Sequence, residues 1–139
     1  MRVLLDTSAL YKRYNHEAGR DQLMAVSERA DELVIAGHCK AEIASALNRQ
    51  RHEGLLNAQD YARIMAVVKA DFDDFTLFAL DARVEAFAVA AMEAGRLPAA
   101  DALHIGTAKA AYVDLFVTAD KRQAQAAQAL GLSTELIDA

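Results

Sequence analysis

Short apolar runs alternate along the chain with longer stretches in which apolar residues recur at helical spacing. The runs are short enough to be buried strands, and they lie at residues 3–5, 33–36, 75–80, 115–118 and 135–137. Apolar residues three and four positions apart predict helices at residues 10–14, 17–30, 39–53, 58–71, 81–94, from Pro98 onward, and 120–131. Predicted strands therefore alternate with predicted helices.

This alternation indicates a mainly parallel sheet, because parallel neighbours need crossover helices that cover both faces of the sheet. We expect an α/β fold with three layers, α/β/α, around a central sheet of four to five strands. The chain has 139 residues, of which 54% are hydrophobic. A chain of this size buries a core without needing disulfides. We therefore expect one domain over residues 1–139.

Capping residues mark several of the predicted helix ends. Asn57, Asp81 and Asp120 stand where helices should begin, and each can accept hydrogen bonds from the first free amides of a helix. Gly54 and Gly131 stand where helices should end. In the helix after Pro98, small residues recur every four positions at Ala102, Gly106 and Ala110. This spacing predicts a seam of close helix packing.

Cysteine content, hydropathy and charge indicate the cellular compartment and the kinds of partner that suit the protein. Cys39 is the single cysteine, so the chain has no internal disulfide, and we expect a reducing cytoplasm. No stretch approaches the ~18 uninterrupted apolar residues of a membrane span, and no signal-peptide pattern opens the sequence. Acids outnumber bases by 20 to 15, giving a net charge of −5. That balance argues against binding nucleic acid through bulk positive charge.

Four acids stand at predicted strand-to-helix junctions. Asp6 follows the first apolar run, and Asp120 follows the run at 115–118. Glu42 and Asp101 lie in the opening turns of two predicted helices. In open parallel sheets, ligands bind at the edge formed by the carboxyl ends of the strands. We expect these four carboxylates to converge on that edge.

Clustered carboxylates repel one another and need a cation. An all-oxygen cluster suits Mg²⁺ or Mn²⁺, which lowers the pKa of bound water and bridges to phosphate oxygens. The sequence thus favours a divalent-metal phosphodiesterase site. Each acid also has a purely structural interpretation: Asp6 and Asp120 can be helix caps, Asp101 can favour a helix dipole, and Glu42 can be a solvated helix residue.

Four segments of the chain form a recognisable set: DTSAL at 6–10, AEIASALNR at 41–49, PAADALHIGTAKA at 98–110 and FVTAD at 116–120. Together they resemble the PIN domain. The compact length resembles that of the VapC toxins, which are PIN domains from VapBC toxin–antitoxin pairs. The resemblance implies a Mg²⁺- or Mn²⁺-dependent endoribonuclease. It assigns metal binding to Asp6, Glu42 and Asp101, with Asp120 completing the cluster.

The same resemblance implies supporting residues and partners. Ser8 and Thr118 match hydroxyl positions near the family's site, and His104 matches a frequent histidine. We interpret His104 as a packing or hydrogen-bonding residue, because Mg²⁺ does not select imidazole. The implied substrate is structured RNA, transfer RNA in particular. A VapB-type antitoxin would block the site and end growth inhibition, and a homodimer would use the helices within 39–70.

Basic and aromatic residues near the acidic edge are candidates for contacts with RNA. Tyr11 and Tyr14 either stack on unpaired bases or pack beneath the first helix. The basic candidates are Lys12, Arg13, Lys40, Arg49, Arg51, His52, Lys121 and Arg122.

Three other functions remain open from the sequence. A phosphatase of the haloacid dehalogenase type also has an Asp after its first strand, but it needs a second Asp where Ser8 stands. A phosphoryl-accepting receiver domain needs a Lys near the end of a later strand, where this chain has Thr118 and Asp120. The third is a non-catalytic module that binds RNA or a protein partner.

Overall fold

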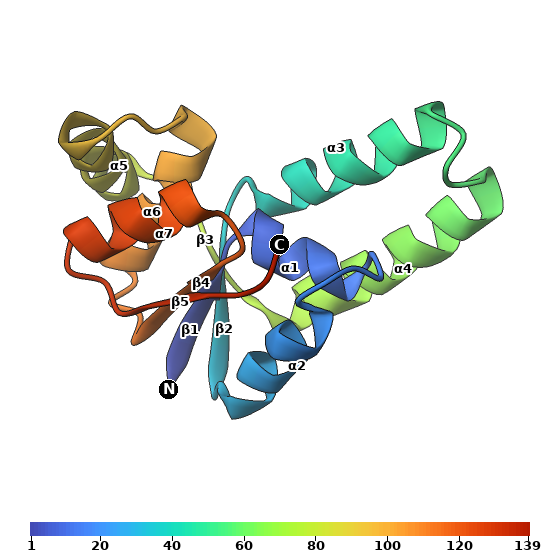
Figure 1. Cartoon of the computed structure of the whole chain (residues 1–139), viewed down its shortest axis with the longest axis horizontal. Helices are drawn as coiled ribbons and strands as arrows, with labels where there is room; N and C mark the ends of the chain where they lie inside the picture. Colours follow the sequence, from blue (N-terminus) through green and yellow to red (C-terminus); the bar gives the residue numbers. More distant parts are fainter.

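Five strands form one fully parallel sheet in the computed structural model, which describes residues 1–139 (Figure 1). The strands are β1 (Arg2–Leu5), β2 (Glu32–Ala36), β3 (Thr76–Phe78), β4 (Leu115–Thr118) and β5 (Thr134–Leu136), in the order β3-β2-β1-β4-β5. The helices are α1 (Thr7–Leu10), the 3₁₀ helix η1 (Tyr11–Arg13), α2 (Arg20–Arg29), α3 (Cys39–His52), α4 (Ala58–Asp74), α5 (Ala82–Ala94), α6 (Ala99–Ala110) and α7 (Lys121–Ala129).

Two hydrophobic cores cover the two faces of this sheet. Side chains alternate along a strand, so Val3 and Leu5 enter one core while Leu4 enters the other. The first core packs α1 to α4 against the sheet, and the second packs α5 to α7 against the opposite face. The expected α/β/α layers and parallel sheet are confirmed.

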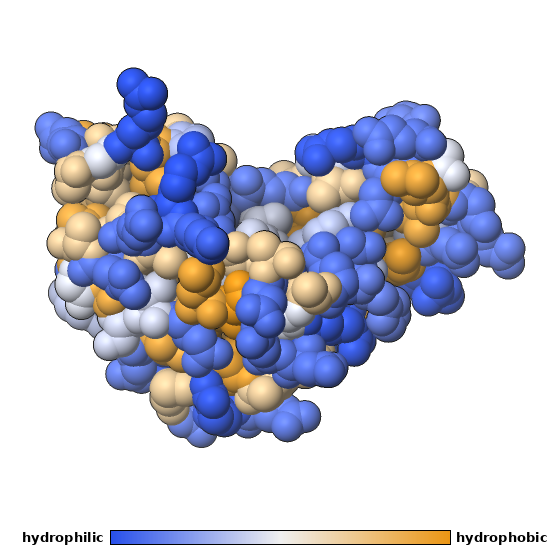
Figure 2. Space-filling view, in the orientation of Figure 1, coloured by the Kyte–Doolittle hydropathy of each residue, from blue (hydrophilic) through white to orange (hydrophobic).

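Helices α3 and α4 form a helical hairpin that extends away from the sheet (Figure 1). The space-filling view shows a hollow between this hairpin and the lobe that holds α5, α6 and α7 (Figure 2). No helix is both long and apolar enough to cross a bilayer.

Most predicted helix ends are confirmed by their hydrogen bonds. The side chain of Asn57 accepts from the amide of Asp60 at 2.8 Å, and that of Asp81 accepts from Val84 at 3.0 Å. Gly131 follows α7 with a φ of 83°, in the left-handed region that favours glycine.

Two predicted boundaries were wrong. The first helix begins at Thr7, not near residue 10, because the Asp6 carboxylate already caps it through the amide of Ala9 at 2.9 Å. Helix α4 continues to Asp74, so the strand expected at 75–80 shortens to Thr76–Phe78. The helix continues past residue 71 with Phe72, which is buried in the first hydrophobic core.

Gly106 allows α5 and α6 to pack closely, as the small-residue spacing predicts. A Cβ at this position would lie 2.4 Å from the carbonyl oxygen of Val84 and 3.0 Å from the amide nitrogen of Ala88. Both atoms belong to the backbone of α5, which cannot move away as a flexible side chain can. Close approach therefore requires glycine at this point of the seam.

We expect Gly106→Ala to destabilise the fold. Alanine favours a helix by about 1 kcal/mol over glycine, but overpacking a core costs about 1–3 kcal/mol, so the net change is a loss. Gly95→Ala is the matched control, because a Cβ there meets nothing within 4 Å. Urea unfolding measures both variants, and a Gly106→Ala protein as stable as the parent would contradict the seam.

Candidate functional site

The four predicted acids gather at the carboxyl edge of the sheet. Strand β1 lies at its centre, with β2 on one side and β4 on the other, so the direction of strand order reverses beside β1. Asp6 directly follows β1, and Asp120 follows β4 and caps α7. Glu42 and Asp101 lie in the first turns of α3 and α6. Crevices at such reversal points are where open α/β sheets bind ligands.

The charges of the other three acids act on Asp101. Burial raises the pKa of Asp101, and the negative charge of Asp120 raises it further. Asp6 and Glu42 contribute in the same direction, while His104 opposes them. All three other acids at this edge therefore raise the pKa of Asp101.

Asp6 is fully buried and has several hydrogen bonds. Its Oδ1 accepts from the Ser8 hydroxyl at 2.7 Å and from the Ala9 amide at 2.9 Å. Its Oδ2 accepts from the hydroxyl of Thr118. Burial nevertheless raises the pKa of Asp6 above its usual value, outweighing the hydrogen bonds and the nearby His104. Asp6 therefore caps α1 and also places a buried carboxylate at the carboxyl edge of the sheet.

Ser8 and Thr118 connect the two loops that carry Asp6 and Asp120. Their hydroxyl oxygens lie 3.2 Å apart. Ser8 also accepts from the Ala119 amide at 3.0 Å, and Thr118 accepts from the Asp120 amide at 3.0 Å. The two hydroxyls predicted near the site thus fix the Asp6 carboxylate relative to the loop after β4.

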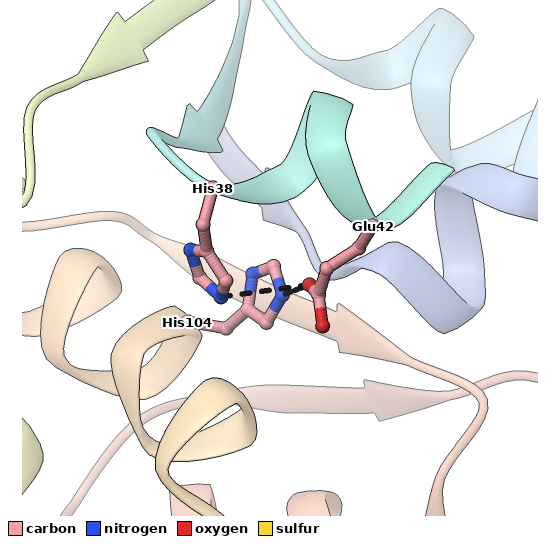
Figure 3. A group of neighbouring side chains, drawn as sticks. All are labelled: His38, Glu42 and His104. Carbon is pink, nitrogen blue, oxygen red and sulfur yellow. Dashed lines mark hydrogen bonds and ion pairs between the residues drawn. The ribbon is translucent and has the colours of Figure 1, made fainter. Parts of the chain in front are cut away.

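Glu42 is held through one of its two oxygens (Figure 3). Oε1 accepts from the Thr7 hydroxyl at 2.6 Å and from His104 Nε2 at 2.7 Å. Burial opposes ionisation, but hydrogen bonds from His104 and Thr7 outweigh it and lower the pKa of Glu42. Oε2 has no protein hydrogen bond. His104 is the buried hydrogen-bonding residue that the sequence suggested.

His38 is a site neighbour that the sequence analysis missed. Its Nε2 lies 3.5 Å from Glu42 Oε1, and its ring centroid lies 4.3 Å from that of His104. Burial, followed by the nearby His104, lowers the pKa of His38, so its imidazole is neutral at pH 7. The spacing of four residues between His38 and Glu42 on a helix start was the signal that could have revealed it.

The acidic cluster has no lysine or arginine partner. Asp120 Oδ1 accepts only backbone bonds, from Arg122 at 2.9 Å and Gln123 at 3.4 Å. None of the four carboxylates forms an ion pair with Lys or Arg; the ion pairs of Glu42 are with histidines. A set of oxygen donors without a counter-charge matches a hard divalent cation, so the residues fit Mg²⁺ or Mn²⁺.

Several of the proposed RNA contacts are corrected by the structure. Lys12 is only 2% exposed, and its Nζ donates to the carbonyl of Ala18 at 2.6 Å. Arg13 donates twice to Asp71, at 2.6 and 3.1 Å. Tyr14 is buried and donates to the same carboxylate at 2.8 Å, so it packs and does not stack on bases. The remaining exposed basic candidates are Lys40, Arg49, His52, Lys121 and Arg122.

Tyr11 and Arg51 are also engaged within the protein. The Tyr11 hydroxyl accepts from Gln50, and Arg51 donates to Asn48 at 3.0 Å while its guanidinium lies 5.3 Å from the Tyr61 ring centroid. Tyr11 thus connects η1 to α3, and Arg51 connects α3 to α4.

A parallel sheet with helices on both faces and acids at its carboxyl edge defines a class of α/β domains, and comparison with known proteins identifies the family. The PIN domain model matches residues 3–129. The chain therefore belongs to the PIN domain family. A search of curated protein sequences finds no match.

Solved structures share this fold at low sequence identity. FitAcB from Neisseria gonorrhoeae has a TM-score of 0.75 at 17% identity, covering 95% of both chains. VapBC2 from Rickettsia felis, bound to a DNA fragment from its promoter, has a TM-score of 0.72 at 12% identity over 99% of this chain and 100% of that one. VapC20 from Mycobacterium tuberculosis, a sarcin-ricin loop cleaving toxin, has a TM-score of 0.67 at 14% identity over 94% and 95%.

We expect Asp6→Asn to leave the metal-free protein as stable as the parent or more stable. A pKa raised on folding means that ionised Asp6 destabilises the fold increasingly as pH rises above the ordinary value of 3.8. An asparagine can accept from Ala9 and Ser8 and donate to Thr118. In EDTA, the melting temperature of the variant relative to the parent should therefore rise from about pH 4 to pH 7. A relative loss of stability with rising pH would contradict this.

Proposed function

We propose that the protein is a Mg²⁺- or Mn²⁺-dependent endoribonuclease and the toxin component of a VapBC-type system, acting in the cytoplasm. The observation that carries the proposal is that Asp6, Glu42, Asp101 and Asp120 stand at one edge of the sheet, where the other three acids act on Asp101, and that none of them pairs with Lys or Arg. Membership of the PIN domain family supports nuclease chemistry for that edge.

We assign metal binding to Asp6, Glu42 and Asp101, with Asp120 completing the cluster. A bound divalent cation supplies a water of lowered pKa and neutralises charge on the scissile phosphate. The chain provides the orientation of the ligands. Ser8 and Thr118 fix Asp6, while Thr7 and His104 hold Oε1 of Glu42 and leave Oε2 for the cluster.

Protonation states also follow from the surroundings of each acid. The hydrogen bonds to Glu42 keep it ionised, because they lower its pKa. Asp6 and Asp101 have raised pKa values, so a cation that binds them also displaces the protons that burial favours. Metal affinity, and with it cleavage, should therefore increase with pH.

The expected partners are RNA and an antitoxin. One similar solved structure is described as a toxin that cleaves the sarcin-ricin loop, and another as a toxin–antitoxin complex from Klebsiella pneumoniae, which supports both expectations for this chain. A basic side chain of an antitoxin would compensate the unpaired carboxylates and so block the site. We further propose that the toxin is a homodimer.

We expect Asp6→Asn to lower RNA cleavage by at least about a hundredfold, because it removes a ligand charge from the cluster. Cleavage of a labelled structured RNA in Mg²⁺ or Mn²⁺ measures the effect, and EDTA should stop the parent reaction. Asp73→Asn is the matched control, since Asp73 is an exposed acid on α4 outside the cluster. Equal cleavage by parent and Asp6→Asn would overturn the proposed function.

Arg122 should contribute to RNA binding through its exposed position on the first turn of α7, beside Asp120. We expect Arg122→Ala to weaken binding of the RNA and to lower the dependence of log affinity on log salt by about one unit. Arg29→Ala is the control, because Arg29 ends α2 and pairs with Glu135. Filter binding with the inactive Asp6→Asn background across a salt series gives both slopes, and an unchanged slope would exclude this contact.

A further inference from the structure

A second group of metal-binding atoms lies next to the carboxylate cluster. One ring nitrogen each of His38 and His104 and a carboxylate oxygen of Glu42 all lie within 4.8 Å of one another, and the Nε2 atoms lie 3.5 and 2.7 Å from Glu42 Oε1. His38 and Glu42 stand four residues apart at the start of α3, and His104 reaches them from α6 (Figure 3). The sheet edge thus holds two imidazoles and a carboxylate around one point.

This donor set differs in chemistry from the four acids. Two imidazole nitrogens with one carboxylate oxygen are a ligand set typical of Zn²⁺ and related transition-metal ions, whereas Mg²⁺ selects oxygen. Three protein ligands leave a fourth position for water. The three side chains are held close together, because His104 is 1% exposed and its ring centroid lies 4.3 Å from that of His38, with the two rings tilted by 38°.

In the metal-free protein, the Nε2 atoms of both histidines are occupied as hydrogen-bond donors. His38 Nε2 lies 2.8 Å from the carbonyl of Ala100, which can only accept, so this nitrogen carries the proton. His104 Nε2 faces the Glu42 carboxylate and likewise donates. The Nδ1 atoms of both rings are buried without a partner. An ion at Nε2 would displace these two protons to Nδ1 and would take the place of the hydrogen bonds from His38 to Ala100 and from His104 to Glu42.

We propose that His38, Glu42 and His104 form a binding site for Zn²⁺ or a similar transition-metal ion. Oε1 of Glu42 faces both histidines, and Oε2 has no protein hydrogen bond. Glu42 therefore joins two sites of different ligand chemistry through its two oxygens. Asp6 and Asp101 contribute no atom to the histidine site, so this inference does not depend on ribonuclease activity.

Zinc titration of the full chain tests the site, using calorimetry in excess Mg²⁺ so that the all-oxygen cluster is saturated. The chain has four histidines, and the other two, His16 and His52, are exposed and lie outside this group. The parent and the double control His16→Ala/His52→Ala should each bind about one Zn²⁺. His38→Ala should bind it at least about tenfold more weakly.

A second variant and a second readout keep the test independent of folding. His104→Gln retains most of the buried volume, and circular dichroism checks its fold. Co²⁺ in place of Zn²⁺ gives visible absorption bands that should appear in the parent and disappear in both the His38 and the His104 variants. Zinc binding that is unchanged in His38→Ala and His104→Gln would overturn the proposal.

The variant Asp6→Asn/Asp101→Asn separates this inference from the proposed function. It should lose RNA cleavage but retain Zn²⁺ binding and the Co²⁺ bands. Loss of Zn²⁺ binding in this folded variant, with binding intact in the histidine variants, would show that the carboxylates hold the ion and would overturn the histidine site. Retained Zn²⁺ binding in a parent that cleaves no RNA would support the histidine site and reject the nuclease.

Discussion

The site depends on keeping unpaired carboxylates at the carboxyl edge of a parallel sheet. Asp6 is fully buried, and its pKa is raised by that burial, so its position destabilises the ionised form. The fold offsets this cost with the hydroxyls of Ser8 and Thr118 and the amide of Ala9. These bonds orient the carboxylate without neutralising it, which leaves its charge available to a cation.

Glu42 is stabilised differently from Asp6. Its contacts with Thr7 and His104 lower its pKa and so favour its ionised form. Burial and the neighbouring acids raise the pKa of Asp101 and so disfavour the ionised form of that residue. Two acids on the same edge thus have pKa values displaced in opposite directions by their surroundings. Such separation is common at functional sites, although structural networks also cause it.

The sequence was sufficient to predict the three layers and the parallel sheet, because hydrophobic periodicity and the alternation of strands with helices determine them. It was insufficient for side chains whose partners come from distant segments. Lys12 looked like a free cation but is buried against the loop at Ala18. The place of His38 beside the site could not be predicted, because its neighbour His104 lies on a helix that is remote in sequence. The metal roles of the four acids remain predictions.

The parallel pairing of β1 with β4 has a consequence for the timing of assembly. Asp6 is made first, but its amide bonds to the carbonyl of Val117 at 3.1 Å and its carboxylate to the hydroxyl of Thr118. A nascent chain that has not yet released β4 from the ribosome therefore lacks both the neighbour of β1 and the anchor of Asp6. The acidic edge forms only after β4 is available, so a chain truncated before β4 carries three of the four acids but no assembled site.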